Sequence, residues 1–361
     1  MMGVGGSMER KTKLINFNEL KPGMVIAKNV EQGRRILIKK DVAITNSVIQ
    51  KLKTTLFLDK IEVYDDTVTN EEKIERKKIE EYKKINEDFN EISTRLQRTF
   101  RLMTNPTSST LNELKEFSER IQNEMHPSSI VIKNIVLQGS GQDSIYRHGV
   151  NVAALSALLG KWIGMKAKDI NRLIYSAMLH DFGKTKIDKE VLQKNGALTT
   201  SEFEVIKTHT TLGYKLLKDI SYLDKSVLYG IVMHHEREDG SGYPLGLKGE
   251  AIHQFGKIIA IADVFDAINS NRGYKKKKPP FEALQIVKNE SLGKLDYEYS
   301  KVFIEHIVNY YLGEEAILNS GERCKIIQMN VNNLEKPLIL RNSEFIELTK
   351  EKNLYIEELV L

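Results

Sequence analysis

The chain has 361 residues, of which 41% are hydrophobic and 29% are charged. At about 150 residues per domain this length suggests two domains, and the composition excludes a wholly disordered chain while supplying a sizeable core. The formal net charge of +5, from 54 basic and 49 acidic residues, is too small to indicate a nucleic acid or a membrane as partner.

The single cysteine, Cys324, excludes an intrachain disulfide and a cysteine-rich zinc site, and it is typical of a reducing, cytoplasmic setting. No run of about 18 apolar residues is present, so we expect no membrane-spanning segment. Residues 1–8 lack the apolar core of a signal peptide, and a second methionine after Gly-Gly-Ser is typical of an expression scar. The predicted fold therefore begins at residue 9.

Residues 9–68 are predicted to form a small α+β domain. Short apolar runs alternate with turn signals, which predicts strands near 25–27, 36–38 and 61–64 and a helix over 46–56. No chemical motif lies in this domain. We therefore expect an accessory role for it, either regulatory or dimerising.

Residues 69–104 are predicted to form a charged linker helix. Acidic and basic residues fill most of its first half, while apolar residues recur at steps of three and four along one stripe. The stripe consists of Tyr82, Ile85, Phe89, Ile92, Leu96, Phe100 and Met103. Two interpretations remain open: the stripe packs against a second copy, giving a homodimer through the 71–103 helix, or it packs on the chain's own domain.

Residues 105–313 are predicted to be a mainly α-helical catalytic bundle, and residues 314–361 a short C-terminal β extension. Six of the eight histidines fall between His148 and His253. Five of the six lie at the edges of predicted apolar helices, namely His148, His180, His209, His234 and His235. The helical bundle therefore brings an unusual number of imidazoles to helix ends.

Carboxylates accompany these histidines. Asp181 follows an apolar helix, and Asp263 and Asp266 share one face of another, where a buried carboxylate normally requires a cation partner. Each residue alone is more often structural than functional. Together, five imidazoles and two of the aspartates form the kind of inward-pointing donor set with which helical bundles build metal sites.

The donor types indicate the metals and the reaction. Mixed imidazole and carboxylate ligands suit iron, manganese, nickel, cobalt or zinc, and no thiolate selects zinc. Seven ligands are too many for one tetrahedral ion and suit two ions bridged by a carboxylate. Two ions about 3.5 to 4 Å apart would hold a bridging hydroxide and clamp a phosphate oxygen, so the predicted reaction is metal-assisted hydrolysis of a phosphoester.

Three further segments bear on this site. Gly183 is expected to end the helix that carries His180 and so to free Lys184. The glycine-rich run 239–246 contains a tyrosine that could stack on a base, although an ordinary turn is the alternative. Cations at 272–275 could hold phosphate, although the lysine run that follows is also typical of a solvated face.

Residues 180–184, His-Asp-Phe-Gly-Lys, resemble the motif of the HD superfamily of metal-dependent phosphohydrolases, and residues 234–244 resemble the signature of its HD-GYP subfamily. The resemblance covers roughly residues 130–312 and includes 262–267. It implies a helical HD-type bundle that hydrolyses the bacterial second messenger cyclic di-GMP to pGpG and onward to GMP.

The resemblance also implies roles for single residues. The residues implied for one metal are His148, His180 and Asp263. Those implied for the other are His209, His234 and His235. Asp181 would bridge the two ions, Lys184 would bind a phosphate oxygen and stabilise charge in the transition state, and Tyr243, Arg272 and Lys275 would contact the substrate. We expect two divalent transition metal ions per chain, iron first and manganese next.

The chain departs from the family pattern at three places, one of which is Lys257, where an arginine is common. Some members hold a third metal with a glutamate four residues before the first histidine, where this chain has Ser144, so we expect two metals. The family often has Arg-Pro-Tyr-Arg where residues 272–275 read Arg-Gly-Tyr-Lys. Gly273 should loosen that loop, and Lys275 keeps the charge but lacks the bidentate fork of arginine.

Three functions remain open. The first is a cyclic di-GMP phosphodiesterase, the second is an HD phosphohydrolase of another cyclic dinucleotide, and the third is a binding or signalling module with vestigial catalysis. The intact donor set argues against the third, because a pure binding module needs no paired metals.

Overall fold

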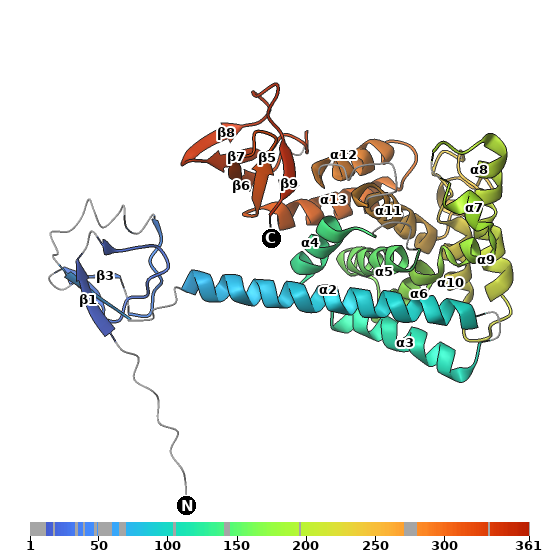
Figure 1. Ribbon diagram of the computed structural model, residues 1–361, viewed down its shortest axis with the longest axis horizontal. Coiled ribbons are helices and arrows are strands. Elements are labelled where there is room, and N and C mark those ends of the chain that lie inside the picture. The colour runs from blue at the N-terminus through green and yellow to red at the C-terminus, as the bar shows by residue number, and fades with distance from the viewer. Residues whose placement is uncertain are drawn as a thin grey trace, which may run out of the picture. The chain divides into compact units, whose positions relative to one another are not determined.

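The computed structural model describes residues 12–64 apart from 17–18, 33–34, 39, 47–48 and 50–59, and residues 70–360 apart from 104–105, 141–144, 195, 271–279 and 331–332. The described chain is mainly helical, with strands near both ends of the sequence (Figure 1), which confirms the predicted fold class. It divides into two compact units, Met1–Glu81 and Tyr82–Leu361.

The described residues of the first unit form two antiparallel strand pairs. β1 (Thr12–Asn16) pairs with β4 (Lys60–Tyr64), and β2 (Val30–Gln32) pairs with β3 (Arg35–Ile38). Its small core of aliphatic side chains includes the fully buried Ile26. This unit therefore has a core of its own, separate from that of the helices.

The predicted strands of this unit are partly confirmed. Those at 36–38 and 61–64 coincide with β3 and β4. The run at 25–27 instead makes two isolated bridges, through Val25 and Ile26. The helix expected over 46–56 falls mainly on residues outside the described part of the chain.

α2 (Asn70–Leu102) is 33 residues long and carries the predicted apolar stripe as far as Phe100, with Met103 directly after the helix. Every residue of the stripe is buried in the core of the second unit, whereas Ile79, outside the stripe, is 41% exposed. Arg95 of α2 donates two hydrogen bonds to Glu116 of α3 (Ser108–Asn123), at 2.6 and 2.8 Å. The stripe thus packs on the chain's own domain. It therefore no longer supports the predicted homodimer.

The helices after α3 form the bundle expected for a catalytic domain. α5 (Ile145–Trp162) is buried without a break from Arg147 to Gly160, and a helix that is apolar on all sides belongs in a core. α5 packs against α6 (Ala167–Leu179) and α11 (Gln254–Asn269). The remaining helices are α4 (Ser128–Gln138), η2 (Phe182–Lys186), α7 (Lys189–Leu192), α8 (Thr200–Lys207), α9 (His209–Leu217), α10 (Lys225–Met233), η3 (Gly249–Ala251), α12 (Pro280–Glu290) and α13 (Tyr297–Tyr311).

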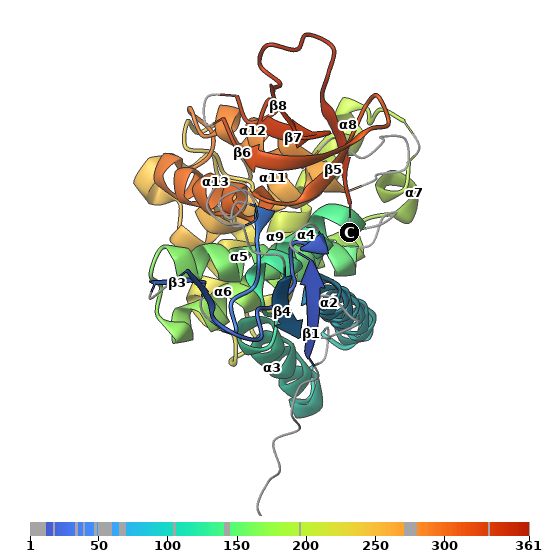
Figure 2. The same ribbon diagram turned by 90° about the vertical axis from the view of Figure 1, so that its left-hand side faces the viewer.

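The predicted C-terminal β extension is a five-stranded antiparallel sheet in the order β8-β7-β6-β5-β9. Figure 2 labels its strands β5 to β8. Its strands are β5 (Glu315–Leu318), β6 (Arg323–Gln328), β7 (Leu338–Arg341), β8 (Glu344–Glu347) and β9 (Ile356–Leu359). Cys324 and Ile326, on either side of the exposed Lys325, are buried in the same core as the bundle. Among the described helices, none is both long enough and apolar enough to cross a membrane.

Replacing Leu96 by alanine should lower the free energy of unfolding by about 2–5 kcal/mol, because a fully buried side chain leaves a cavity behind it. The control Ile79→Ala changes an exposed position of the same helix and should cost less than about 0.5 kcal/mol. Urea unfolding followed by circular dichroism checks both values. Equal losses in the two variants would contradict the packing of the stripe on its own domain.

Candidate metal centre

The seven side chains expected to bind metal converge from the ends and faces of five helices. His180 and His234 occupy the C-terminal caps of α6 and α10, and Asp181 and His235 follow them. The others are His148 in the first turn of α5, His209 as the first residue of α9, and Asp263 within α11. Thus α6 and α10 supply ligands where they end, α5 and α9 where they begin, and α11 from its interior.

Their donor atoms form overlapping groups. His148, His180 and Asp263 form one group, and in each group all ligand atoms lie within 4.8 Å of one another. The members of the second are His209, His234 and His235. A third group joins Asp181 to His180 and His234, so Asp181 lies between the other two. The two main groups have the same members as the two sets that the resemblance implies, one for each metal.

Three imidazoles are held in the same way. Nδ1 of His180, His209 and His234 lies 2.6, 2.7 and 2.8 Å from the backbone carbonyl oxygen three residues earlier. Since a carbonyl only accepts, each Nδ1 carries the proton, and each Nε2 presents a lone pair to the site. Metal-binding histidines are oriented by this type of contact.

These Nε2 lone pairs find few hydrogen-bond donors among the described residues. Nε2 of His209 and Nε2 of His234 are both acceptors and lie 3.2 Å apart. Among the described residues, Nε2 of His180 and Oδ1 of Asp181 are buried without a hydrogen-bond partner. Buried unpaired acceptors destabilise a fold unless a cation satisfies them, so the donor set fits metal ions.

The protonation states of four of the histidines also suit metal binding. Burial lowers the pKa of His180, His234 and His235, and it lowers that of His209 to about 4. These four rings are therefore neutral at pH 7. Neutral imidazole is the form that binds metal.

The two carboxylates are ionised. Burial acts to raise the pKa of Asp181, but nearby positive charge, chiefly that of Lys184, outweighs it and holds the pKa well below its usual range. Burial likewise acts on Asp263 and is outweighed chiefly by a contact with His148. Two negative charges therefore lie beside four neutral imidazoles, and the site attracts cations.

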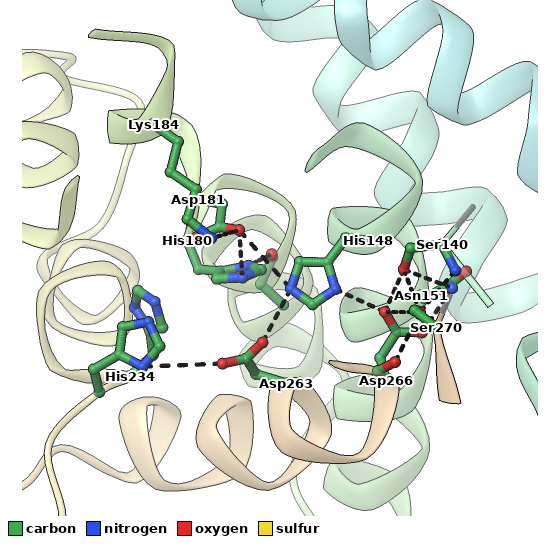
Figure 3. Close-up of polar contacts among 12 residues, drawn as sticks. Ser140, His148, Asn151, His180, Asp181, Lys184, His234, Asp263, Asp266 and Ser270 are labelled. Carbon is green, nitrogen blue, oxygen red and sulfur yellow. Dashed lines mark hydrogen bonds and ion pairs between the residues drawn. The ribbon is translucent and has the colours of Figure 1, made fainter. Parts of the chain in front are cut away.

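Asp266 does not join the donor set, although it shares a helix face with Asp263. Its Oδ2 lies 2.7 Å from Nδ1 of His148, and its Oδ1 accepts a hydrogen bond from Nδ2 of Asn151 at 2.7 Å (Figure 3). The hydroxyl of Ser140 also donates to this carboxylate. The cation partner expected for Asp266 is therefore protonated His148 and not a metal, and Asp266 orients that ring.

His148 itself differs from the other rings. Its Nε2 lies 3.0 Å from Oδ1 of Asp263. Burial lowers its pKa, but Asp263 and Asp266 raise it more, to about 9. A proton therefore occupies Nε2 at pH 7, and a metal at this position would displace it.

The structure corrects the expectation that Gly183 ends the helix of His180 and frees Lys184. α6 ends at Leu179, and Gly183 lies within η2 instead of ending that helix. A Cβ added to Gly183 would lie 1.9 Å from the carbonyl oxygen of His209, so glycine is required for the close approach of α9. Lys184 is not free either, since its Nζ donates to Oδ2 of Asp181 at 2.7 Å.

The loop after His235 is fixed by a carboxylate to which the sequence analysis assigns no role. Glu236 is buried and accepts hydrogen bonds from the backbone of Leu245 and Leu247, at 2.7 and 2.9 Å. Tyr243 stacks on His235, with ring centroids 4.7 Å apart and an interplanar angle of 28°. Burial raises the pKa of Tyr243, so its phenol keeps the proton and can donate it in a hydrogen bond.

Lys207, the last residue of α8, is a further cation that the sequence analysis does not single out. Its Nζ lies 5.6 Å from the centroid of the Tyr243 ring and 2.6 Å from Oε1 of Glu204. Its position two residues before His209 is the signal that could have found it. Arg272 and Lys275 lie outside the described residues, as does Ser144, and their roles stay predictions.

The family follows from a comparison with known proteins. Residues 108–298 match the HD domain family over more than half of the chain, and the chain belongs to that family. The resemblance predicted from residues 180–184 is thereby confirmed. With 19% sequence identity and a TM-score of 0.52, the fold is similar to that of Bd1817, an HDG"Y"P protein from Bdellovibrio bacteriovorus, over 82% of this chain and 99% of that one.

Relatives of similar sequence carry more particular names. The chain is 41% identical over 164 residues to a cyclic di-GMP phosphodiesterase of Thermotoga maritima, covering 44% of this chain and 43% of that protein. It is 30% identical over 214 residues to a cyclic di-GMP phosphodiesterase of Pseudomonas aeruginosa, covering 59% and 51%. It is 36% identical over 167 residues to a 3'3'-cGAMP-specific phosphodiesterase of Vibrio cholerae, covering 46% and 38%. The matches span about half or less of each relative.

Replacing Asp181 by alanine should weaken metal binding at both main groups, because its carboxylate lies between them. We expect a loss of affinity well above the roughly 10-fold that removal of an outer-shell partner causes. The matched control is Asp188→Ala, which removes an exposed cap of the short helix α7. Titration of each metal-free variant with Mn²⁺ makes the comparison, and wild-type affinity in Asp181→Ala would contradict the bridging position.

Proposed function

We propose that this protein is a metal-dependent phosphodiesterase that hydrolyses cyclic di-GMP, to pGpG, to GMP or to both. The observation that carries the proposal is a set of buried imidazole acceptors without donors. In this set, Nε2 of His209 and Nε2 of His234 lie 3.2 Å apart. Two of the relatives named above are cyclic di-GMP phosphodiesterases, which supports the choice of substrate.

The metals would be held by the two main groups of ligand atoms, with Asp181 shared between them. Bound divalent ions supply Lewis-acid activation of a phosphodiester and a water of lowered pKa. Iron and manganese both suit mixed imidazole and carboxylate ligands, and we propose iron as the first choice and manganese as the second.

Lys184 would bind the phosphate. Its side chain is about one-fifth exposed, and its Nζ already contacts Oδ2 of Asp181, so it can reach a substrate oxygen placed beside that carboxylate. A fixed ammonium group at this place stabilises the negative charge that grows on the phosphoryl oxygens in the transition state. Lys184 therefore serves both binding and charge stabilisation.

Tyr243 and Lys207 would bind the rest of the dinucleotide. The Tyr243 ring is held against His235 and keeps its phenolic proton, so it offers one aromatic face and one hydrogen-bond donor. Lys207 lies beside the same ring and adds a positive charge. Arg272 and Lys275 are proposed as further contacts on the family pattern.

A second candidate substrate is 3'3'-cGAMP. The relative from Vibrio cholerae that is named for this substrate is 36% identical to the chain. Both substrates are cyclic dinucleotides, and the groups proposed to contact metal and phosphate serve either one. Selection between them depends on contacts to the bases.

Hydrolysis of the two cyclic dinucleotides by the same metal-loaded sample tests the proposal. Protein purified without oxygen and loaded with Fe²⁺ or Mn²⁺ should cleave cyclic di-GMP with a kcat/KM at least about 10-fold above that for 3'3'-cGAMP, a difference of about 1.4 kcal/mol in transition-state binding. The opposite ratio favours the second candidate. Tight binding of cyclic di-GMP with no turnover by the fully loaded protein overturns the enzyme and favours a binding module.

Tyr243→Ala should raise KM for cyclic di-GMP about 10-fold with little change in kcat, because one stacking contact contributes about 1–3 kcal/mol of binding. Tyr229→Ala is the control, since Tyr229 is an exposed tyrosine of α10 that faces His253 rather than the metal centre. Steady-state kinetics separates the two parameters. A fall in kcat at unchanged KM would show that Tyr243 acts on the reaction step instead.

A further inference from the structure

A chain of buried hydrogen bonds leads from the metal centre to α2. Asp266, which orients His148, accepts from Nδ2 of Asn151 at 2.7 Å (Figure 3). Oδ1 of the same Asn151 accepts from Nε of Arg147 at 3.1 Å. Nη1 of Arg147 then donates to Oδ1 of Asn90, on α2, at 2.6 Å. Continuous hydrogen bonding therefore joins α2 to a proposed metal ligand.

Arg147 is an unusual residue for the position it occupies. It is 7% exposed in the core of the bundle, where a charged side chain is costly unless its hydrogen bonds are satisfied. Its guanidinium donates to amide oxygens from three helices, since Nη2 also reaches Oδ1 of Asn134 on α4 at 2.7 Å. Its Cζ lies 4.7 Å from the centroid of the Phe89 ring on α2. The guanidinium thus fixes α2 and α4 against α5.

Two features of α5 explain how one helix contacts both α2 and the metal centre. Arg147 and His148 are adjacent, so their side chains leave the helix about 100° apart and reach α2 and the metal centre respectively. Asn151 lies one turn after Arg147, on the same face, and its amide bonds the guanidinium on one side and Asp266 on the other. Moving Arg147 therefore moves the group that holds Asp266.

We propose that Asn90 and Arg147 are positioning residues for His148, so that the metal affinity of the centre depends on how α2 packs on the bundle. The inference rests on the proposed function to the extent that His148 holds a metal. α2 begins at Asn70, in the first unit, and continues into the second. Because coupling between sites is reciprocal, metal binding should in turn stabilise the packing of α2.

Arg147→Lys and Asn90→Ala test the proposal. The first keeps the positive charge but loses the planar fork that bonds three amides, and the second removes the α2 end alone. We expect metal-free Arg147→Lys to bind Mn²⁺ about 10-fold more weakly than wild type, the loss typical of outer-shell partners. Asn90→Ala should show a smaller loss in the same direction.

Thr99→Val is the matched control. Thr99 is also fully buried on α2 and also bonds a neighbouring helix, through Oγ1 to Oε2 of Glu113 on α3 at 2.8 Å, but it has no link to Asp266. It should lower the melting temperature without changing the affinity for Mn²⁺. A merely structural role of Arg147 would make Arg147→Lys behave like Thr99→Val.

Hydrogen exchange gives a readout that does not depend on activity. Adding Mn²⁺ should slow amide exchange in residues 82–100 of wild type and should do so less in Arg147→Lys. Wild-type Mn²⁺ affinity in both Arg147→Lys and Asn90→Ala, in a protein that itself binds metal and hydrolyses substrate, overturns this inference and leaves the proposed function standing. A wild-type protein that binds no metal overturns both.

Discussion

The structure depends on one constraint: buried histidine nitrogen acceptors lie close together with too few hydrogen-bond donors. Backbone carbonyls fix the Nδ1 protons of His180, His209 and His234, which turns three Nε2 lone pairs inward beside ionised Asp181 and Asp263. Without a metal ion this arrangement opposes folding, because Nε2 lone pairs face one another in a region of low dielectric. With divalent ions, the same atoms become a ligand set, and the neighbouring helices hold it rigid.

The fold meets this constraint by bringing helix ends together at close range. Gly183 lets η2 approach the first turn of α9 so closely that no other residue fits without a shift of backbone. Asp266 and Asn151 fix His148 from behind, and Glu236 fixes the loop that carries Tyr243. Buried carboxylates and amides thus orient the proposed metal ligands and the loop beside them.

The sequence predicts the parts of the molecule that depend on composition and local pattern. The histidines and aspartates at helix ends, the long helix with its apolar stripe and the C-terminal strands can all be recognised without coordinates. The partner of the stripe cannot, because a stripe of period 3.6 packs equally well on a second copy or on its own domain. The prediction that Gly183 ends a helix fails for a similar reason. The residues that require glycine there belong to α9, which is remote from Gly183 in the sequence. The bonds among Arg147, Asn151 and Asp266 join separate helices, and no spacing in the sequence reveals them.

Metal stoichiometry tests the central claim most directly. Protein purified without oxygen, reloaded with Fe²⁺ or Mn²⁺ and freed of excess ion should contain two metal ions per chain by elemental analysis, one for each main group of ligand atoms. Two ions, both lost when the shared carboxylate is removed, is the result the account predicts. One ion or none after reloading would contradict it, because the buried acceptors would then need another explanation.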